Sequence, residues 1–186
     1  MDVVGTIALA LLTSFVASAL FLLSLTRIRP KFAISPQIAR SVRGEELSYA
    51  IKVINRTRFD LIDVRARLEN LVIIAGVNNP LTRRRHIPLR FSEILVLSKY
   101  DRDDRQADYA FRFTTASELS VRTLGKNTII RFSIIAKHSL SGFSSASEQR
   151  YGLTDIVDGT FATGDSLSIT PLDDEDLRIL RRLLQS

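Results

Sequence analysis

Few side chains in this sequence are of types that could carry out catalysis. The chain has no cysteine and two histidines, His86 and His138, which are too few for a thiolate or histidine metal site. His138 and Ser139 are adjacent, but neighbouring residues of a strand point to opposite faces, and the sequence shows no third partner for a catalytic triad. Nucleophile elbows, glycine-rich phosphate loops and metalloprotease motifs are absent. We therefore expect no enzymatic activity, no small-molecule substrate and no cofactor.

The stretch from residue 100 to residue 108 is rich in aspartate and suggests a calcium site. Its four aspartates are Asp101, Asp103, Asp104 and Asp108. The spacing does not match an EF-hand loop, because Gln106 replaces the required glycine and Arg112 stands where the bidentate glutamate belongs. Arg102 and Arg105 also neutralise the aspartates, so the pattern predicts a solvated loop without a metal ion.

The densest basic patch is the triplet Arg83, Arg84 and Arg85, in a chain with a formal charge of +6. Nucleic-acid binding needs a broad basic face with aromatic platforms, whereas the residues that flank this triplet are apolar or neutral. We predict a solvated hairpin, with a basic contact to lipid headgroups or to an acidic partner as the functional alternative. We expect no nucleic-acid partner.

The elements that would position these residues begin with an apolar segment. Residues 3 to 25 contain no charged side chain, and as a helix they are long enough to cross a hydrocarbon core of about 30 Å. A cleaved signal peptide is the alternative, because residues 17–19 have the small side chains of a cleavage site. No base precedes the segment, however, and its apolar character continues past that site. We predict a retained transmembrane anchor over residues 1–25.

The charges on either side of this segment predict its orientation. Arg27, Arg29 and Lys31 follow it in a linker, residues 26–31, whereas only Asp2 precedes it. The positive-inside rule then predicts a single-pass protein of the plasma (inner) membrane, with its N-terminus outside and the rest of the chain in the cytoplasm. The three bases either only fix this topology or also contact anionic lipid headgroups.

One face of the apolar segment carries small side chains. They recur every four residues and are Thr6, Ala10, Ser14 and Ser18. Rows of small residues let two membrane helices approach closely. The pattern predicts association with a second copy of the chain or with another membrane protein.

Residues 32–170 alternate between apolar and polar side chains, which is typical of strands. In residues 47–53, for example, Leu47, Tyr49 and Ile51 alternate with polar or small residues, and residues 127–138 predict a central strand covered on both faces. Further strands are expected near 32–38, 86–97, 143–151 and 157–169, with turn residues between them. Seven or eight short strands predict a mainly β domain, specifically an immunoglobulin-like β-sandwich.

Residues 171–186 predict a short amphipathic helix. Thr170 has the character of an N-cap and Pro171 of a first helical residue. Leu177, Leu180 and Leu184 form an apolar stripe. This stripe packs on the chain's own sandwich, on a partner subunit or on the membrane.

The order of elements resembles the C-terminal half of an inward-rectifier potassium channel. Residues 29–31 (RPK) resemble the family's basic linker, and residues 49–56 (YAIKVINR) resemble its strand that ends in valine-x-asparagine-arginine. Residues 146–161 resemble a later stretch that contains an arginine and tyrosine, an isoleucine and a glycine-x-phenylalanine. The chain is also similar to uncharacterised single-span bacterial membrane proteins.

This resemblance implies an immunoglobulin-like cytoplasmic domain after a transmembrane helix, with a linker that contacts phosphoinositide headgroups. The sequence has no pore helix and no selectivity filter of the TxGYG type, so we expect no potassium conduction by the family's mechanism. We expect a membrane-anchored cytoplasmic β-sandwich that acts as a binding or assembly module. The alternative is an accessory or pore-forming subunit of an oligomeric, channel-like membrane complex.

Overall fold

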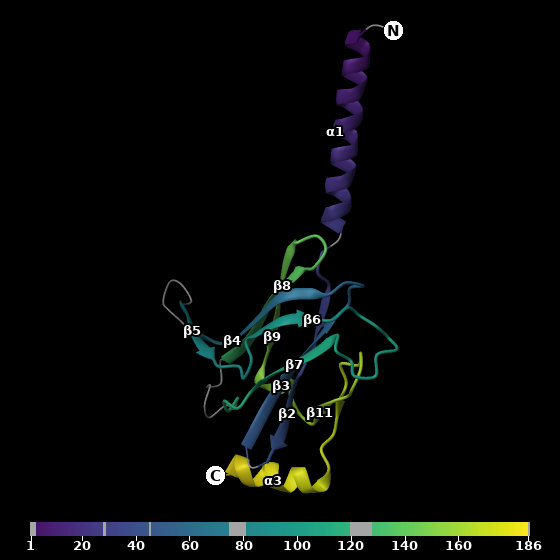
Figure 1. Cartoon of the computed structure of the whole chain (residues 1–186). Coiled ribbons are helices and arrows are strands. Elements are labelled where there is room, and N and C mark those ends of the chain that lie inside the picture. Colours follow the sequence, from purple (N-terminus) through teal and green to yellow (C-terminus); the bar gives the residue numbers. More distant parts are fainter. Residues whose placement is uncertain (1–2, 28, 45, 75–80, 120–127, 186) are drawn as a thin grey trace.

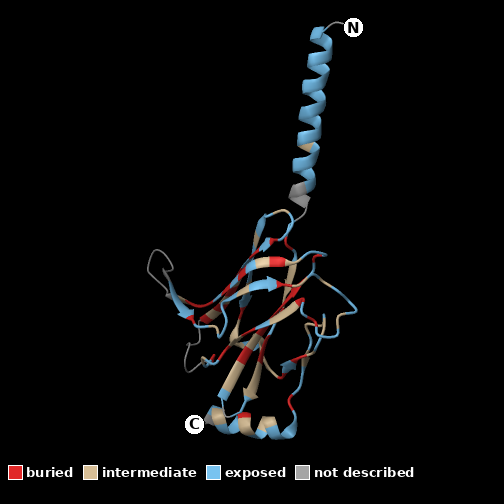
Figure 2. Cartoon of the chain, in the orientation of Figure 1, coloured by how far each residue is buried: buried red, intermediate tan, exposed pale blue. Residues whose placement is uncertain are grey.

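The computed structural model describes residues 3–27, 29–44, 46–74, 81–119 and 128–185 of the chain. The N-terminal helix α1 (Val3–Arg27) extends away from a β domain, as Figure 1 shows. Its segment Val3–Ser24 is long and apolar enough to cross a membrane, and none of it is buried against the β domain. Figure 2 shows almost all of the helix residues up to Ser24 as exposed, whereas the strands carry most of the buried residues. An apolar helix that does not pack on its own domain needs another apolar environment.

The first of two five-stranded sheets, sheet A, is arranged around one long strand. Its strands are β1 (Phe32–Ile34), β2 (Ile38–Arg43), β3 (Glu46–Asn55), β7 (Ala110–Thr115) and β10 (Ile156–Asp158). The central strand β3 pairs antiparallel with β1 and β2 along one edge and with β7 along the other. β10 joins the outer edge of β2 in parallel. Sheet A is therefore centred on the sequence YAIKVIN, whose alternation predicts a strand.

The second sheet, sheet B, contains the longest strand of the described chain. Its strands are β4 (Leu61–Ile74), β5 (Leu81–Ile87), β6 (Glu93–Leu97), β8 (Thr128–His138) and β9 (Ser144–Tyr151). The order is β5-β4-β8-β9, and β6 pairs with the first half of β4. The ladder between β4 and β8 is interrupted by an irregularity between Ile62 and Arg65, where Asp63 has a positive φ of 51°. Such a bulge increases the local twist of the strand.

Both sheets contribute to one hydrophobic core. Sheet A supplies Tyr49, Ile51 and Val53 from alternate positions of β3, and sheet B supplies Phe132 and other residues of β8. The rings of Phe113 and Phe132, one from each sheet, lie 5.5 Å apart. The prediction of a mainly β chain with a helix at each end is confirmed.

Some predicted strands differ from those observed. The single strand expected near 86–97 is two strands, β5 and β6, because Pro88 lacks the N–H that would continue the ladder. The strand expected near 157–169 is three short strands, β10, β11 (Thr160–Phe161) and β12 (Ile169–Thr170), preceded by the 3-10 turn η1 (Leu153–Asp155). β11 and β12 form a small hairpin of their own. The described residues thus hold more strands than the pattern predicts.

The C-terminal helix α3 (Asp174–Gln185) packs against β2 and β3 of its own domain. Its stripe residue Leu180 is 1% exposed, whereas Leu184 is 38% exposed. The expected cap, Thr170, is wrong, because Thr170 pairs with Thr160 in the β11–β12 hairpin. Asp173 caps the helix instead: its Oδ1 accepts a hydrogen bond of 2.8 Å from the N–H of Asp176.

Replacing Leu180 with alanine is expected to lower the free energy of unfolding by about 2–5 kcal/mol, because it leaves a cavity under α3. Leu184→Ala, in the same helix, is the matched control and is expected to cost less than about 1 kcal/mol. Denaturant unfolding of the full chain in detergent micelles measures both values. Equal losses in the two variants would contradict the packing of α3 on the β domain.

Candidate functional site

The linker after α1 joins the β domain at one defined place. Arg29 and Lys31 are exposed, while Pro30 between them is buried. The carbonyl of Lys31 accepts a hydrogen bond of 2.8 Å from the N–H of Arg56, and Phe32 pairs with Asn55. The predicted headgroup ligands Arg29 and Lys31 therefore lie beside the turn that connects β3 to β4. The third, Arg27, is the last residue of α1, and its side chain lies outside the described residues.

The β3–β4 turn, residues 56–60, is held by the buried side chain of Asn55. Its Nδ2 donates hydrogen bonds to the carbonyls of Phe59 at 2.9 Å and Ser98 at 2.8 Å. Its Oδ1 accepts hydrogen bonds from the N–H of Thr57 at 2.8 Å and from the Thr57 hydroxyl at 2.7 Å. Because both ends of the amide are satisfied, Asn55 fixes the turn and the chain after β6 in one arrangement.

The β8–β9 turn, residues 139–143, lies against the same region. The N–H of Ser139 donates a hydrogen bond of 3.1 Å to the carbonyl of Asp60, and the rings of Phe59 and His138 are 4.9 Å apart. The turn exposes two apolar side chains, Leu140 at 62% and Phe143 at 37%. Figure 1 shows this turn at the end of the β domain where α1 enters.

Together these segments form a surface that we call the α1-proximal surface. Its exposed residues are Arg29, Lys31, Arg58, Phe59, Leu140 and Phe143. Basic side chains with long apolar stems, next to exposed apolar rings and chains, are typical of surfaces that meet the boundary between water and lipid. Sequence reasoning found the two linker bases but missed the apolar residues of the two turns.

The arginine triplet lies in β5, which forms an antiparallel hairpin with β4, and all three arginines are exposed, so the prediction of a solvated hairpin is confirmed, although they lie in a strand and not in its loop. Arg84 stands opposite Leu71 of β4, whereas Arg83 and Arg85 stand opposite Val72 and Asn70. Successive strand residues point to opposite faces, so Arg84 is separated from its two neighbours. β5 pairs with the half of β4 beyond Leu68, roughly 20–35 Å along the strand from the end beside His138. The triplet therefore does not extend the α1-proximal surface.

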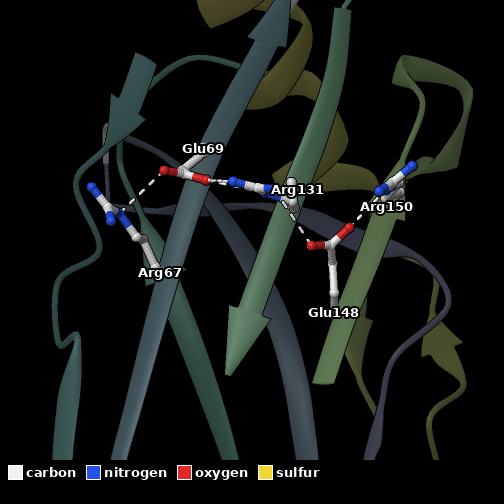
Figure 3. Close-up of polar contacts among 5 residues, drawn as sticks. All are labelled: Arg67, Glu69, Arg131, Glu148 and Arg150. Carbon is white, nitrogen blue, oxygen red and sulfur yellow. Dashed lines mark hydrogen bonds and ion pairs between the residues drawn. The ribbon is translucent and has the colours of Figure 1, made fainter. Parts of the chain in front are cut away.

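The outer face of sheet B carries a network of ion pairs, which Figure 3 shows across three strands. Glu69 of β4 binds Arg131 of β8 and, at 3.2 Å, Arg67 of its own strand. Glu148 of β9 contacts Arg131 at 3.5 Å and Arg150 at 2.7 Å. The hydrogen bond from Arg131 holds the pKa of Glu69 below its usual value. Two carboxylates offset the charge of three arginines, so the network mainly joins strands and leaves little net charge for a ligand.

The remaining predicted positions lie on α1 and in the aspartate-rich loop. The small residues Thr6, Ala10, Ser14 and Ser18 are exposed along α1, where a second helix would meet them. In the loop, Asp104 accepts hydrogen bonds from the N–H groups of Gln106 and Asp108 and thereby shapes its own turn. Within the described ranges, no group of three histidines and carboxylates is placed to hold a metal ion.

Comparison with known proteins adds little. No family model matches the chain, and no curated protein matches it. One similar solved structure is Spo0M, a sporulation control protein from Bacillus subtilis, with 12% sequence identity and a TM-score of 0.36. The alignment covers 67% of this chain and 48% of that one, so this chain corresponds to about half of that protein's length. At this TM-score the likeness carries no argument about fold or function.

His138 makes the β8–β9 turn sensitive to pH. Its side chain is buried, and its Nδ1 accepts hydrogen bonds of 3.3 Å from the N–H groups of Leu140 and Ser141. Burial lowers the pKa of His138, so the folded protein favours the neutral imidazole. Above the ordinary histidine pKa of about 6.5, the imidazole is neutral in both the folded and the unfolded chain, and the folded state keeps its full stability. As the pH falls below this value, the unfolded chain binds the proton more readily than the folded chain, so the free energy of unfolding falls.

We therefore expect the free energy of unfolding to fall between pH 7 and pH 5.5, with the β8–β9 turn opening first. His138→Asn keeps a hydrogen-bond acceptor at the turn but does not titrate in this range, so its stability is expected to change less. Urea unfolding at a series of pH values, together with hydrogen exchange at Leu140 and Ser141, measures both effects. His86→Asn, at the exposed histidine, is the matched control; if it flattens the pH dependence as much as His138→Asn, the assignment is wrong.

Proposed function

We propose that the chain is a single-pass membrane protein whose cytoplasmic β domain acts as a binding or assembly module. In this proposal α1 is the anchor, and the α1-proximal surface rests on the anionic leaflet. The β domain is an immunoglobulin-like sandwich, an assignment supported by two mainly antiparallel sheets that share one core.

The observation that carries this proposal is that a short linker connects an exposed apolar helix to the α1-proximal surface, which has both basic and apolar side chains. α1 ends at Arg27 and β1 begins at Phe32. The four residues between them reach roughly 14 Å at most when fully extended. If α1 spans a bilayer, Arg29 and Lys31 must therefore lie at headgroup level, with the β3–β4 turn beside them.

The energetics indicate what this contact does. A base near an anionic leaflet contributes about 1 kcal/mol, so Arg29, Lys31 and Arg58 together contribute roughly 3 kcal/mol. Burying an apolar helix of this length is worth far more, so α1 alone holds the chain in the membrane. The bases and the side chains of Leu140 and Phe143 therefore orient the β domain. The far end, which carries α3 in Figure 1, then faces the cytoplasm and is open to a partner.

The proposed topology predicts that a cysteine on β9 is protected in intact cells. The chain contains no cysteine, so Ser147→Cys, at an exposed position, introduces a single reactive thiol. In bacterial spheroplasts a membrane-impermeant maleimide is expected to label this thiol only after the membrane is permeabilised. Full labelling before permeabilisation would reverse the topology.

The lipid contact predicts that Arg29→Gln with Lys31→Gln reduces capture of anionic lipid. Losing two bases removes roughly 2 kcal/mol of local attraction, and we expect at least a threefold lower yield of photocrosslinked phosphatidylglycerol in nanodiscs. Arg178→Gln with Arg181→Gln removes the same charge from exposed positions on α3 and is expected to change nothing.

The matched pair of variants decides what the linker bases do. If the linker variant captures as much lipid as the parent protein, Arg29 and Lys31 only fix the topology. If both double variants lose capture equally, the contact depends on net charge and not on the α1-proximal surface.

A further inference from the structure

The outer face of sheet A holds a cleft of about 620 Å³. Its floor consists of small side chains that alternate along β2, β3 and β7, and these residues are Ala39, Ser41, Ser48, Ala50 and Thr114. The register places Ala50 between Ala39 on one neighbouring strand and Thr114 on the other. Side chains this short leave an open depression on the sheet, of a size that accommodates a small molecule.

One wall of the cleft is the segment that leads into and through β11, which Figure 1 shows beside β2. Lys52 reaches out of β3 and donates hydrogen bonds to the carbonyls of Ala162 at 2.7 Å, Gly164 at 2.7 Å and Ser166 at 2.8 Å. Arg112 of β7 donates a hydrogen bond of 2.8 Å to the carbonyl of Phe161. These two cations clamp the wall to the sheet, so the cleft is a built feature of the fold.

The start of this wall depends on a glycine. Gly159 has φ +154°, and a Cβ at this position would lie 2.4 Å from both the Ile169 side chain and the Thr170 carbonyl oxygen. Only glycine allows β12 to approach so closely. The close approach at Gly159 therefore positions the paired strands of the β11–β12 hairpin, and the hydrogen bonds from Lys52 hold its loop.

The lining of the cleft is strongly one-sided in charge. Among the described residues, those of its lining that are ionisable are Arg43, Lys52, Arg90 and Arg112, and none of the lining is an aspartate or glutamate. Among the ion pairs formed by described residues, none involves Arg43, Arg90 or Arg112. This contrasts with the outer face of sheet B, where Glu69 and Glu148 form ion pairs with three arginines. Burial, and next the charge of Arg112, lowers the pKa of Lys52 to about 8, so Lys52 is still mainly protonated at pH 7.

We propose that this cleft binds the anionic group, a phosphate or a carboxylate, of a small soluble molecule. Arginine guanidinium groups match the planar and bidentate geometry of both anions. A concave site lined by one sign of charge concentrates the opposite sign, and the field is strongest where the walls exclude water. Arg43 and Arg90 stand exposed at the cleft and take part in none of the ion pairs of the described residues, and hydroxyls of Ser41, Ser48 and Thr114 can donate further hydrogen bonds from the floor.

The test measures binding of pyrophosphate and of citrate to the full chain in phosphatidylcholine nanodiscs by isothermal titration calorimetry at low salt. We expect at least one probe to bind the parent protein. Arg43→Gln with Arg90→Gln is expected to weaken that binding at least tenfold. The α3 variant Arg178→Gln with Arg181→Gln loses the same charge and is expected to bind like the parent.

A second variant tests the shape of the cleft. Ala50→Leu keeps every charge but fills the floor, and it is also expected to weaken binding at least tenfold; its thermal midpoint, measured alongside, checks that it folds. The proposal is overturned if neither probe binds the parent protein, or if the two arginine double variants lose affinity equally, since that loss would report net charge alone.

A lipid headgroup is the other source of the same anion, and one further measurement separates the two. If the cleft takes a soluble ligand, Arg43→Gln with Arg90→Gln leaves phosphatidylglycerol crosslinking in anionic nanodiscs unchanged. If this variant loses lipid capture as well, the occupant is a headgroup and the assignment to a soluble molecule is wrong. Neither result depends on whether Arg29 and Lys31 contact lipid.

Discussion

The arrangement of the α1-proximal end depends on the side chain of Asn55. This amide is buried at the last position of β3, where it is hydrogen-bonded to the β3–β4 turn and to the chain after β6. Phe32, the first residue after the linker, pairs with Asn55 through the backbone. An apolar residue of similar size would remove the partner of the buried Thr57 N–H, which costs roughly 1–3 kcal/mol, and would also lose the hydrogen bond to the Ser98 carbonyl. The linker, the β3–β4 turn and the chain after β6 therefore share one polar anchor.

The strand that ends in Asn55 also separates two chemically different sides of the molecule. Tyr49, Ile51 and Val53 face the core that the two sheets share. Ala50 and Lys52 alternate with them and face the outer cleft. Because side chains alternate between the two faces of a strand, one set of β3 side chains packs in the core and stabilises the fold, and the other set lines the cleft. Lys52 belongs to this second set, although a lysine between isoleucine and valine looks in sequence like an ordinary exposed strand position.

Local patterns account for what the sequence predicted correctly. The apolar run that forms α1, the alternation that forms the strands and the apolar stripe that forms α3 are all properties of consecutive residues. The wrong predictions occur where the local structure is determined by contacts between residues that are separated in the sequence. Thr170 has the side chain of a helix cap, but pairing with Thr160 draws it into a strand. The cleft could not be predicted in the same way, because Arg43, Arg90 and Arg112 come from three separate segments. A single sequence does not reveal that pairing with β3 brings two of them to one face.

The short linker between α1 and β1 also limits how the β domain can move. A long flexible tether would let a domain sample many heights and orientations above a bilayer, whereas the residues between Arg27 and Phe32 allow only a narrow range. In the proposed topology, copies anchored in the same leaflet would carry their clefts and their α3 helices at a common height, and diffusion would bring them together in a plane. When two such copies meet, their matching faces already lie at the same height above the membrane. A low-affinity contact between matching faces would therefore be populated on the membrane at copy numbers that leave the detached domains monomeric in solution.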